Sequence, residues 1–473
     1  MNTPRPEIPV AENDKDALIL ALSAKIIELE KTVAELQGKL GLNSSNSSLP
    51  PSKDGFNKSK SNKNTSIRDT STKKSGGQEG HPGTTLSPVA NPDKVIPHHP
   101  PGHCDCGLSL AGAQVKVETR QVFDIPPVKP VITEHQVFET VCQCGKVHRG
   151  QFPAEVKASV QYGPVAKATA VSLTCQEMLP INRTGQLMGT MFCLPMSDAA
   201  VLNAQNEAQW LLSPIVDAIA KALKTAPVLH ADETGMNVGG KNKWVHIAAT
   251  AMLTWMGAHN KRGKEAFDAL GILGQATGIL IHDGLSSYRL FDEAVHGLCN
   301  QHHLRELNFV ATQMNQEWAG HMMTLLRTAC HEVNASAANV LPVERLAYFR
   351  LVYEVLLLDG EAVNPKAEKE AGKRGKAKQG KAYNLLLRLR GYADDVWRFA
   401  YDPNVPFTNN IAEQAVRMNK VKQKVSGCFR SMEGLEKFCV IRSYLATLHK
   451  QGVNIFAALI QTFAGSAPMP QFL

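Results

Sequence analysis

Apolar residues near the start of the chain recur in alternating steps of three and four. They are Ile19, Leu22, Ile26, Leu29, Val33, Leu36 and Leu40. β-Branched residues at one set of heptad positions and Leu at the other favour a parallel two-stranded coiled coil. The pattern predicts a coiled-coil helix over residues 1–42, through which the chain forms a homo-oligomer. An amphipathic helix packed on its own chain would show the same pattern.

Helical periodicity returns after residue 157, with breaks at Leu179-Pro180 and Leu194-Pro195. Residues 151–226 are predicted to form a helical DNA-binding segment. Within it, Ser197 to Leu211 follow a short turn, as the second helix of a helix-turn-helix unit does. Any helical hairpin would look similar.

The pattern changes to strands after Thr225. A buried strand is expected at 228–232 and another at 278–283, with a hairpin of two strands at 244–259 between them. Helices are expected at 264–273, from about 300 to 360 and again from 382. Residues 227–430 are therefore predicted to form an α/β domain with a helical insertion at about 305–382, and residues 431–473 to form C-terminal helices.

Composition adds a polyanionic partner to this picture. The formal net charge is +8, and residues 43–75 carry seven Lys and Arg against two Asp among Ser, Asn and Thr. Residues 43–92 are predicted to be a flexible basic linker, because such a composition buries too little apolar surface to fold. The linker either follows a phosphate backbone or is merely solvated. No secretory signal and no run of about 20 apolar residues is present, so a cytoplasmic protein without membrane contact is expected.

Two carboxylates stand where predicted strands end. Asp232 follows the run VLHA, Asp283 follows ILIH, and each has Gly within a few residues. With Asp283 51 positions after Asp232, Asp232 is expected mid-sheet and Asp283 on the adjacent strand. Hard cations such as Mg²⁺ bind oxygen ligands, so two or three converging carboxylates suffice to hold them.

Glu413 is the third candidate acid. The steps from Glu413 to Arg417, Lys420 and Lys424 place one acid and three bases on one face of a helix. The apolar stripe opposite is predicted at Ile411, Ala415, Met418, Val421 and Val425. The charged face, with Lys422 also proposed to contact DNA, would meet a phosphate backbone. A capping box with Asn410 as N-cap is the alternative role for Glu413.

The cysteines suggest a second metal. Cys104, Cys106, Cys142 and Cys144 form two close pairs within residues 93–150. Four thiolates can close a structural Zn²⁺ site, although two disulfides or free thiols are alternatives. The string CNQHHLR (299–305) also has metal-ligand spacing. Here substrate positioning by His302 and phosphate orientation by Arg305 are favoured over zinc, with a plain core role as the alternative.

Together these strings resemble the insertion sequence 66 transposases over nearly the whole chain. The matching parts are the heptads with LNSSNSSLPPSKD, then GGQEGHPG, the cysteine pairs, HADETG, LIHDG, CNQHHLREL and VPFTNNIAEQAVRMNKVKQKVSG. The resemblance implies an RNase H-like catalytic core of the DDE type, a zinc-binding domain and a helical insertion before the last acid. By motif, the catalytic acids fall on Asp232, Asp283 and Glu413.

The function implied is metal-dependent cleavage and strand transfer on DNA. Mg²⁺ or Mn²⁺ would lie on the three acids, and the partners would be the element's terminal inverted repeats and target DNA. Such an enzyme would work at the nucleoid of a prokaryote. Two alternatives remain: a DNA-binding regulator or transposition accessory protein without catalysis, and an RNase H-like nuclease that cuts without joining.

Overall fold

The computed structural model describes residues 86–472 except 111, 113–115, 292–293, 369–376 and 378, together with Lys25, Ile26 and Leu29. The predicted coiled coil at 1–42 and most of the predicted linker at 43–92 therefore lie outside the described residues. Across the part of the chain that is described, no helix combines the length and apolarity that a membrane span requires.

A five-stranded mixed sheet forms the centre of the fold, in the order β5-β4-β3-β6-β7. Its strands are β3 (Val228–Val238), β4 (Lys241–Ala249), β5 (Thr254–His259), β6 (Ile279–His282) and β7 (Val295–Leu298). Neighbours β3, β4 and β5 are antiparallel, whereas β6 and β7 run parallel to β3. The predicted α/β fold and the predicted hairpin at 244–259 are confirmed.

Helices surround this sheet. The longer ones are α2 (Pro164–Val171), α3 (Ile181–Phe192), α4 (Asp198–Lys224), α5 (Lys264–Leu270), α6 (Asn300–Gln313), α7 (Glu317–Ala335), α8 (Val343–Val363), α9 (Lys381–Gly391), α10 (Ala393–Trp397), α11 (Asn410–Ser426), α12 (Met432–Lys450) and α13 (Ile455–Phe463). The π-turn η3 (Ser172–Gln176) continues α2, and the 3₁₀ turns are η4 (Leu273–Gln275), η5 (Ser286–Leu290) and η6 (Arg398–Ala400). The breaks predicted at the two Leu-Pro steps are confirmed by the ends of α3.

One hydrophobic core joins the helices before the sheet to the sheet itself. Leu212 of α4, Leu229 of β3, Leu280 of β6 and Leu448 of α12 are fully buried in it. Helix α4 continues well past Leu211 to Lys224, and its apolar face packs on α12 and α2. Residues 164–224 therefore belong to the same core as the sheet.

Helix α12 covers the free edge of the sheet. The backbone N–H groups of Thr254 and Met256 on β5 donate to the hydroxyls of Thr447 (2.9 Å) and Ser443 (2.8 Å) on α12. An uncovered edge strand leaves backbone groups open to pairing with another chain. Here two hydroxyls occupy donors that would otherwise pair with a further strand.

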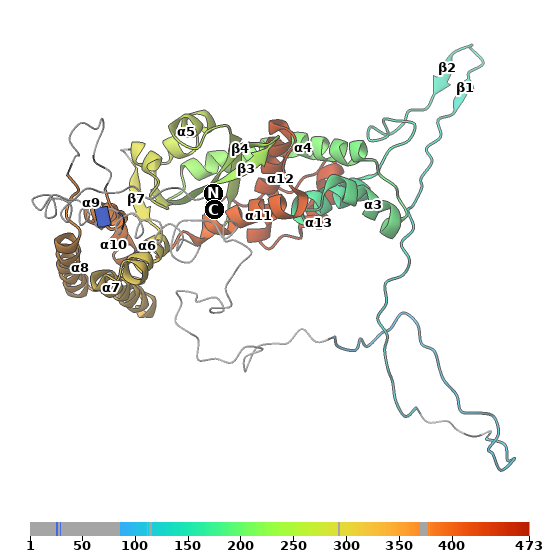
Figure 1. Cartoon of the computed structure of the whole chain (residues 1–473). Helices are drawn as coiled ribbons and strands as arrows, with labels where there is room; N and C mark the ends of the chain where they lie inside the picture. The colour runs from blue at the N-terminus through green and yellow to red at the C-terminus, as the bar shows by residue number, and fades with distance from the viewer. Residues whose placement is uncertain are drawn as a thin grey trace, which may run out of the picture.

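The helices of the insertion pack around a second hydrophobic core, which holds Leu326, Leu357, Leu386 and Trp397 together with Ile281 of β6 and Leu298 of β7. Figure 1 shows α7 to α10 gathered beside β7, at the opposite end of the sheet from α3 and α13. The predicted insertion at about 305–382 lies within a longer run of helices. Helix α6 begins at Asn300, directly after β7, and helical structure continues through η6 to Ala400.

Candidate active site

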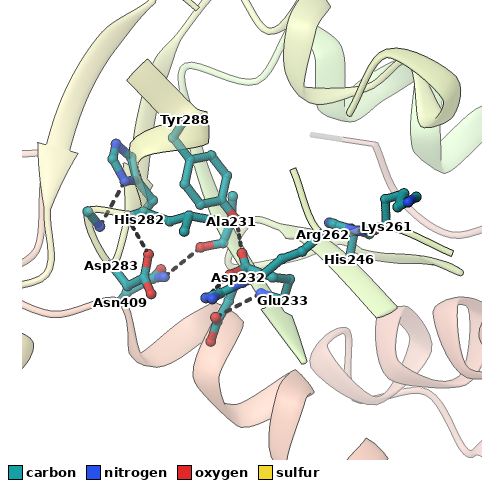
Figure 2. A network of polar contacts seen from close by, with 12 residues as sticks. Ala231, Asp232, Glu233, His246, Lys261, Arg262, His282, Asp283, Tyr288 and Asn409 are labelled. Carbon is teal, nitrogen blue, oxygen red and sulfur yellow. Dashed lines mark hydrogen bonds and ion pairs between the residues drawn. The ribbon is translucent and has the colours of Figure 1, made fainter. Parts of the chain in front are cut away.

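The register of the sheet brings Asp232 and Asp283 level with each other. β3 pairs with β6 in parallel, with His230 opposite Ile281. Two positions further along each chain, Asp232 and Asp283 therefore come to the same level. One carboxylate oxygen from each of Asp232, Glu233 and Asp283 lies within 4.8 Å of the others. The predicted adjacency of the two aspartates is supported, and Figure 2 shows the cluster.

The sequence pattern predicted that Asp232 ends its strand, and this prediction was wrong. β3 runs on to Val238 because β4 pairs with it antiparallel, with Asp232 opposite Ile247. On the other side of β3, the pairing with β6 stops at His230 and Ile281, and β6 ends at His282. The open position beside β3 arises from the short β6, and Asp232 and Asp283 occupy it.

A glycine and two histidines shape the turn that carries Asp283. Gly284 has a φ of +89°, a conformation that suits glycine, and its N–H donates to Nδ1 of His282 (3.0 Å). Nε2 of His282 lies 3.0 Å from Nδ1 of His296. Burial lowers the pKa of both imidazoles, so the pair is neutral at pH 7. Leu285 N–H donates to Asp283 Oδ1 (2.9 Å), which fixes the carboxylate.

Glu413 reaches this region from α11. The first residue before that helix, Asn409, ties it to β3: its Nδ2 donates to the carbonyl of Ala231 (2.8 Å), and its Oδ1 lies 2.9 Å from Nδ1 of His230. Burial lowers the pKa of His230 to about 4, so the neutral ring donates to Oδ1. Asn409 is the N-cap but makes no side-chain cap hydrogen bond, and the capping box expected on Asn410 is not formed.

Like charges crowd Asp232. Burial, and then the neighbouring Glu233 and Asp283, raise the pKa of Asp232 well above its ordinary value, and Glu413 adds to the same effect. Asp232, Asp283 and Glu413 are thus close enough to interact, although Glu413 stands outside the group of oxygens within 4.8 Å. Three acids gathered at one place suit a site for a divalent metal ion.

The crowding of acids around Asp232 makes the stability of the metal-free protein depend on pH. Because the folded-state pKa of Asp232 is raised, the metal-free protein loses stability as the pH rises through that pKa. Asp232→Asn cannot ionise, so we expect it to raise the melting temperature at pH 7 in a chelator by about 2–4 °C, which about 1 kcal/mol gives in a domain of this size. The gain should vanish at acidic pH. Calorimetry at both pH values measures it, and a lower melting temperature at pH 7 would contradict the crowding.

Glu233 is a site residue that sequence reasoning missed. Its side chain is fully buried, accepts from Arg262 Nε (2.8 Å) and Nη2 (2.6 Å), and accepts from the Tyr288 hydroxyl (2.5 Å). Burial raises its pKa, as does the charge of Asp283. Adjacent residues of a strand point to opposite faces, so only one of the two acids in HADETG was assigned to the site. The partners of Glu233, Arg262 and Tyr288, lie far along the chain and could not be paired with it from the sequence.

A second group of ligand-type side chains surrounds Glu413. Sγ of Cys299 lies 3.7 Å from Oε1 of Glu413, and Nδ1 of His302 lies 3.8 Å from the same oxygen. Burial, and then Glu413, raise the pKa of the Cys299 thiol to about 12. Cys299 and His302 stand at the junction of β7 and α6. The structure therefore turns His302 Nδ1 toward an active-site acid.

The basic side chains of α11 divide into two groups. Arg417 and Lys424 are exposed, as predicted. Lys420 donates to the carbonyl of Gly235 on β3, and Arg305 on α6 is half-buried. Lys422 is buried, and its Nζ donates to the carbonyls of Thr174 (3.0 Å) and Leu179 (3.2 Å).

The predicted DNA contact at Lys422 is therefore not supported. The predicted apolar stripe of α11 was also wrong at two positions. Val421 and Val425 are exposed, and the helix buries Ala412, Ala415, Asn419 and Lys422 instead. Lys422 turns into the interface because its ammonium finds acceptors there, the carbonyls of Thr174 in the π-turn and of Leu179 just after it.

The two cysteine pairs form two turns with the same hydrogen bonds. Cys104 N–H donates to Leu108 O, and Cys142 N–H donates to Lys146 O. Gly107 and Gly145 close the turns with φ of +87° and +85°. The second turn joins β1 (Glu139–Val141) to β2 (Val147–Arg149). Among the described residues, the groups of three or more close metal-ligand side chains do not include these cysteines, so the predicted four-thiolate site stays a prediction.

Two family comparisons match the chain. Residues 3–87 match a family of unknown function (DUF6444). No curated protein matches. Residues 159–437, which hold the sheet, the helical insertion and the acids Asp232, Asp283 and Glu413, match the family described as Transposase IS66 family. The chain therefore belongs to the IS66 family of transposases.

Proposed function

We propose that this chain is a DDE-type DNA transposase that cleaves the ends of its element and joins them to target DNA. The strand order β5-β4-β3-β6-β7, with the first three antiparallel and the last two parallel to β3, supports an RNase H-like core. The observation that carries the proposal is the meeting of Asp232 and Asp283 on neighbouring strands, with Glu413 beside them on α11.

The donor set fits Mg²⁺ or Mn²⁺. Asp232, Asp283 and Glu413 offer hard oxygen atoms, and the neighbouring acids that help raise the pKa of Asp232 would favour a bound cation. When bound, a pair of such ions lowers the pKa of an attacking water or hydroxyl and stabilises charge on the leaving oxygen. Asp232 and Asp283 would hold the cations jointly from the sheet, and Glu413 would complete the set from the helix.

The protein's own residues fix the geometry of this site. Asn409 ties α11 to β3 and so sets the approach of Glu413. Arg262 pairs with Glu233 and so offsets part of the negative charge that Glu233 places beside Asp232. Arg305 would orient a phosphate, and His302 would act on substrate through its placement of Glu413. Phosphoryl transfer depends chiefly on such positioning and on electrostatic stabilisation.

Exposed bases on α11 would bind the DNA backbone. Arg417 and Lys424 lie two helical turns apart, about 10 Å along the axis, with Lys420 between them on the same face. We expect replacing Arg417 and Lys424 by Ala to weaken binding equally for all DNA sequences and to reduce the salt dependence by about two phosphate contacts. Binding measured across a salt series tests this, with Lys264→Ala on α5 as the control.

The proposed zinc site lies in the cysteine segment. We infer that Cys104, Cys106, Cys142 and Cys144 bind Zn²⁺. Each pair lies in its own tight turn, and the two turns have the same hydrogen bonds. Hydrogen bonds from Cys106 lower the pKa of Cys104, and those from Cys144 lower the pKa of Cys142, which favours thiolates. The coiled coil at 1–42 remains the proposed route to a homo-oligomer.

Strand-transfer assays test the enzymatic proposal. Purified full-length protein is incubated with Mg²⁺ and a duplex bearing the inverted repeat that flanks its gene, together with a target plasmid. We expect nicks at the repeat end and covalent joining of its 3′ end to the plasmid. Nicking without joining would make the chain a nuclease, and specific binding without nicking would make it a regulator.

A further inference from the structure

The side chains of Cys299, His302 and Glu413 form a closed triangle of metal-ligand atoms that the proposed catalysis does not explain. Sγ, a ring nitrogen and Oε1 all lie within 4.8 Å of one another. We propose that this triangle is a binding site for a thiophilic divalent ion of the Zn²⁺ class, and that such an ion inhibits the enzyme by occupying Glu413.

The spacing of the triangle fits a four-coordinate ion. Zn–S bonds of about 2.3 Å and Zn–N or Zn–O bonds of about 2.0–2.1 Å, at tetrahedral angles, place the ligand atoms about 3.3–3.6 Å apart. The two measured edges, Sγ to Oε1 and Nδ1 to Oε1, are 3.7 and 3.8 Å. Along these two edges, an ion would need the ligand atoms to approach by only a few tenths of an ångström, and the third edge is within 4.8 Å.

His302 provides an independent indication. Its Nδ1 is buried and has no hydrogen-bond partner among the described residues, because 3.8 Å to Glu413 is too long for one. A buried ring nitrogen without a partner is costly. An ion bound between His302 and Glu413 would supply the missing contact.

The surroundings orient Cys299 as a metal ligand, and a bound ion would favour its thiolate form, whereas burial and Glu413 raise the pKa of the thiol in the ion-free protein. Cys299 precedes α6, so its sulfur lies at the positive end of a helix dipole. The backbone N–H of Asn409 donates to Sγ (3.1 Å), and the backbone N–H of His302 donates to the Cys299 carbonyl (3.1 Å). Such outer contacts orient metal ligands and strengthen binding. Three protein ligands leave one position for water.

The chemistry of the ligands decides which ion binds. A thiolate and an imidazole select Zn²⁺, Co²⁺ or Cd²⁺ over Mg²⁺, whereas Asp232 and Asp283 offer only oxygen. Glu413 belongs to both sets, so it cannot serve the two sites in the same way at once. Inhibition by zinc rests on the proposed function of Glu413, but binding of the ion does not.

Cobalt spectroscopy tests binding without reference to activity. In full-length protein with Cys104, Cys106, Cys142 and Cys144 all changed to Ser, Co²⁺ should give one equivalent of visible four-coordinate bands with a thiolate-to-cobalt charge-transfer band. Cys299→Ser should remove the charge-transfer band, and His302→Ala should weaken Co²⁺ binding at least about tenfold. Cys439→Ser, which removes an equally buried thiol (both 1% exposed), should change neither.

Each outcome decides the proposal. Absence of the charge-transfer band, or its persistence in the Cys299→Ser variant, overturns it. If the four-serine protein does not fold, zinc content of the unmodified chain and of its Cys299→Ser variant is compared, and equal content overturns the proposal.

Inhibition is then measured as the ratio of cleavage rates with and without Zn²⁺ in excess Mg²⁺. The concentration giving half inhibition should rise at least about tenfold in Cys299→Ser, and an unchanged value overturns the inhibitory role. If the protein cuts no DNA under any condition, the proposed function fails, while the cobalt result still decides the metal site.

Discussion

Asp232→Asn is expected to lower the rate of DNA strand cleavage in Mg²⁺ by at least about 10³-fold, a loss of about 4 kcal/mol of transition-state stabilisation. The amide keeps the shape of the side chain but removes a charge that would hold the proposed metal ions beside Asp283. Binding to the element end should change by no more than a few-fold, because the bases proposed to contact DNA lie on α11. Single-turnover cleavage of a labelled end and a binding titration measure the two quantities.

Asp268→Asn is the control for that experiment. Asp268 is an exposed carboxylate on α5 that pairs with Lys264 (3.1 Å) on the surface of the same domain. This variant should cleave at the rate of the unmodified protein. Equal losses of binding and cleavage in Asp232→Asn would argue against a catalytic role for Asp232.

Asn409→Ala is expected to produce the second largest effect, a fall in cleavage of about 10²-fold with a clear loss of stability. The substitution leaves the buried carbonyl of Ala231 and Nδ1 of His230 without partners, at about 1–3 kcal/mol each. It also releases α11 from β3, so Glu413 is no longer held beside Asp232. Misplacement by about 1 Å can cost about 10²-fold in rate.

Asn410→Ala provides a neighbouring control for this prediction. Asn410 is the same residue type, one position later, and is exposed at the start of α11. It should leave the melting temperature and the cleavage rate close to those of the unmodified protein. If both alanine variants behave alike, Asn409 does not set the position of Glu413.

The sequence contained enough to predict the aspartate pair. Asp232 and Asp283 follow apolar runs, and a parallel pairing of those runs places them side by side, as the structure has it. The hairpin at 244–259 was also readable, because its strands are apolar and adjacent in the chain. The helices after β7 were visible from periodicity, and α6 begins at Asn300, where helix was expected from about residue 300.

What the sequence could not show depends on tertiary contacts. Glu233 looks like an exposed neighbour of Asp232 until Arg262 and Tyr288 arrive from other elements to bury it. Lys422 looks like one base among several on α11, yet it enters the core because Thr174 and Leu179 offer carbonyls there. Periodicity assigns residues to the faces of a helix, but it does not show which face packs against a segment with free hydrogen-bond acceptors.

The contacts of Lys422 limit how this enzyme can be divided. Together with Ser426, which donates to the Met178 carbonyl, and Arg442, which donates to the Cys175 carbonyl (3.3 Å), Lys422 fastens the last helices to a segment that precedes the sheet by some fifty residues. A fragment starting at Val228 would keep all three acids but leave two buried cations with no acceptors. Dissecting the protein at the start of the sheet should therefore yield insoluble material, whereas a cut before Pro164 would preserve the interlocking ends.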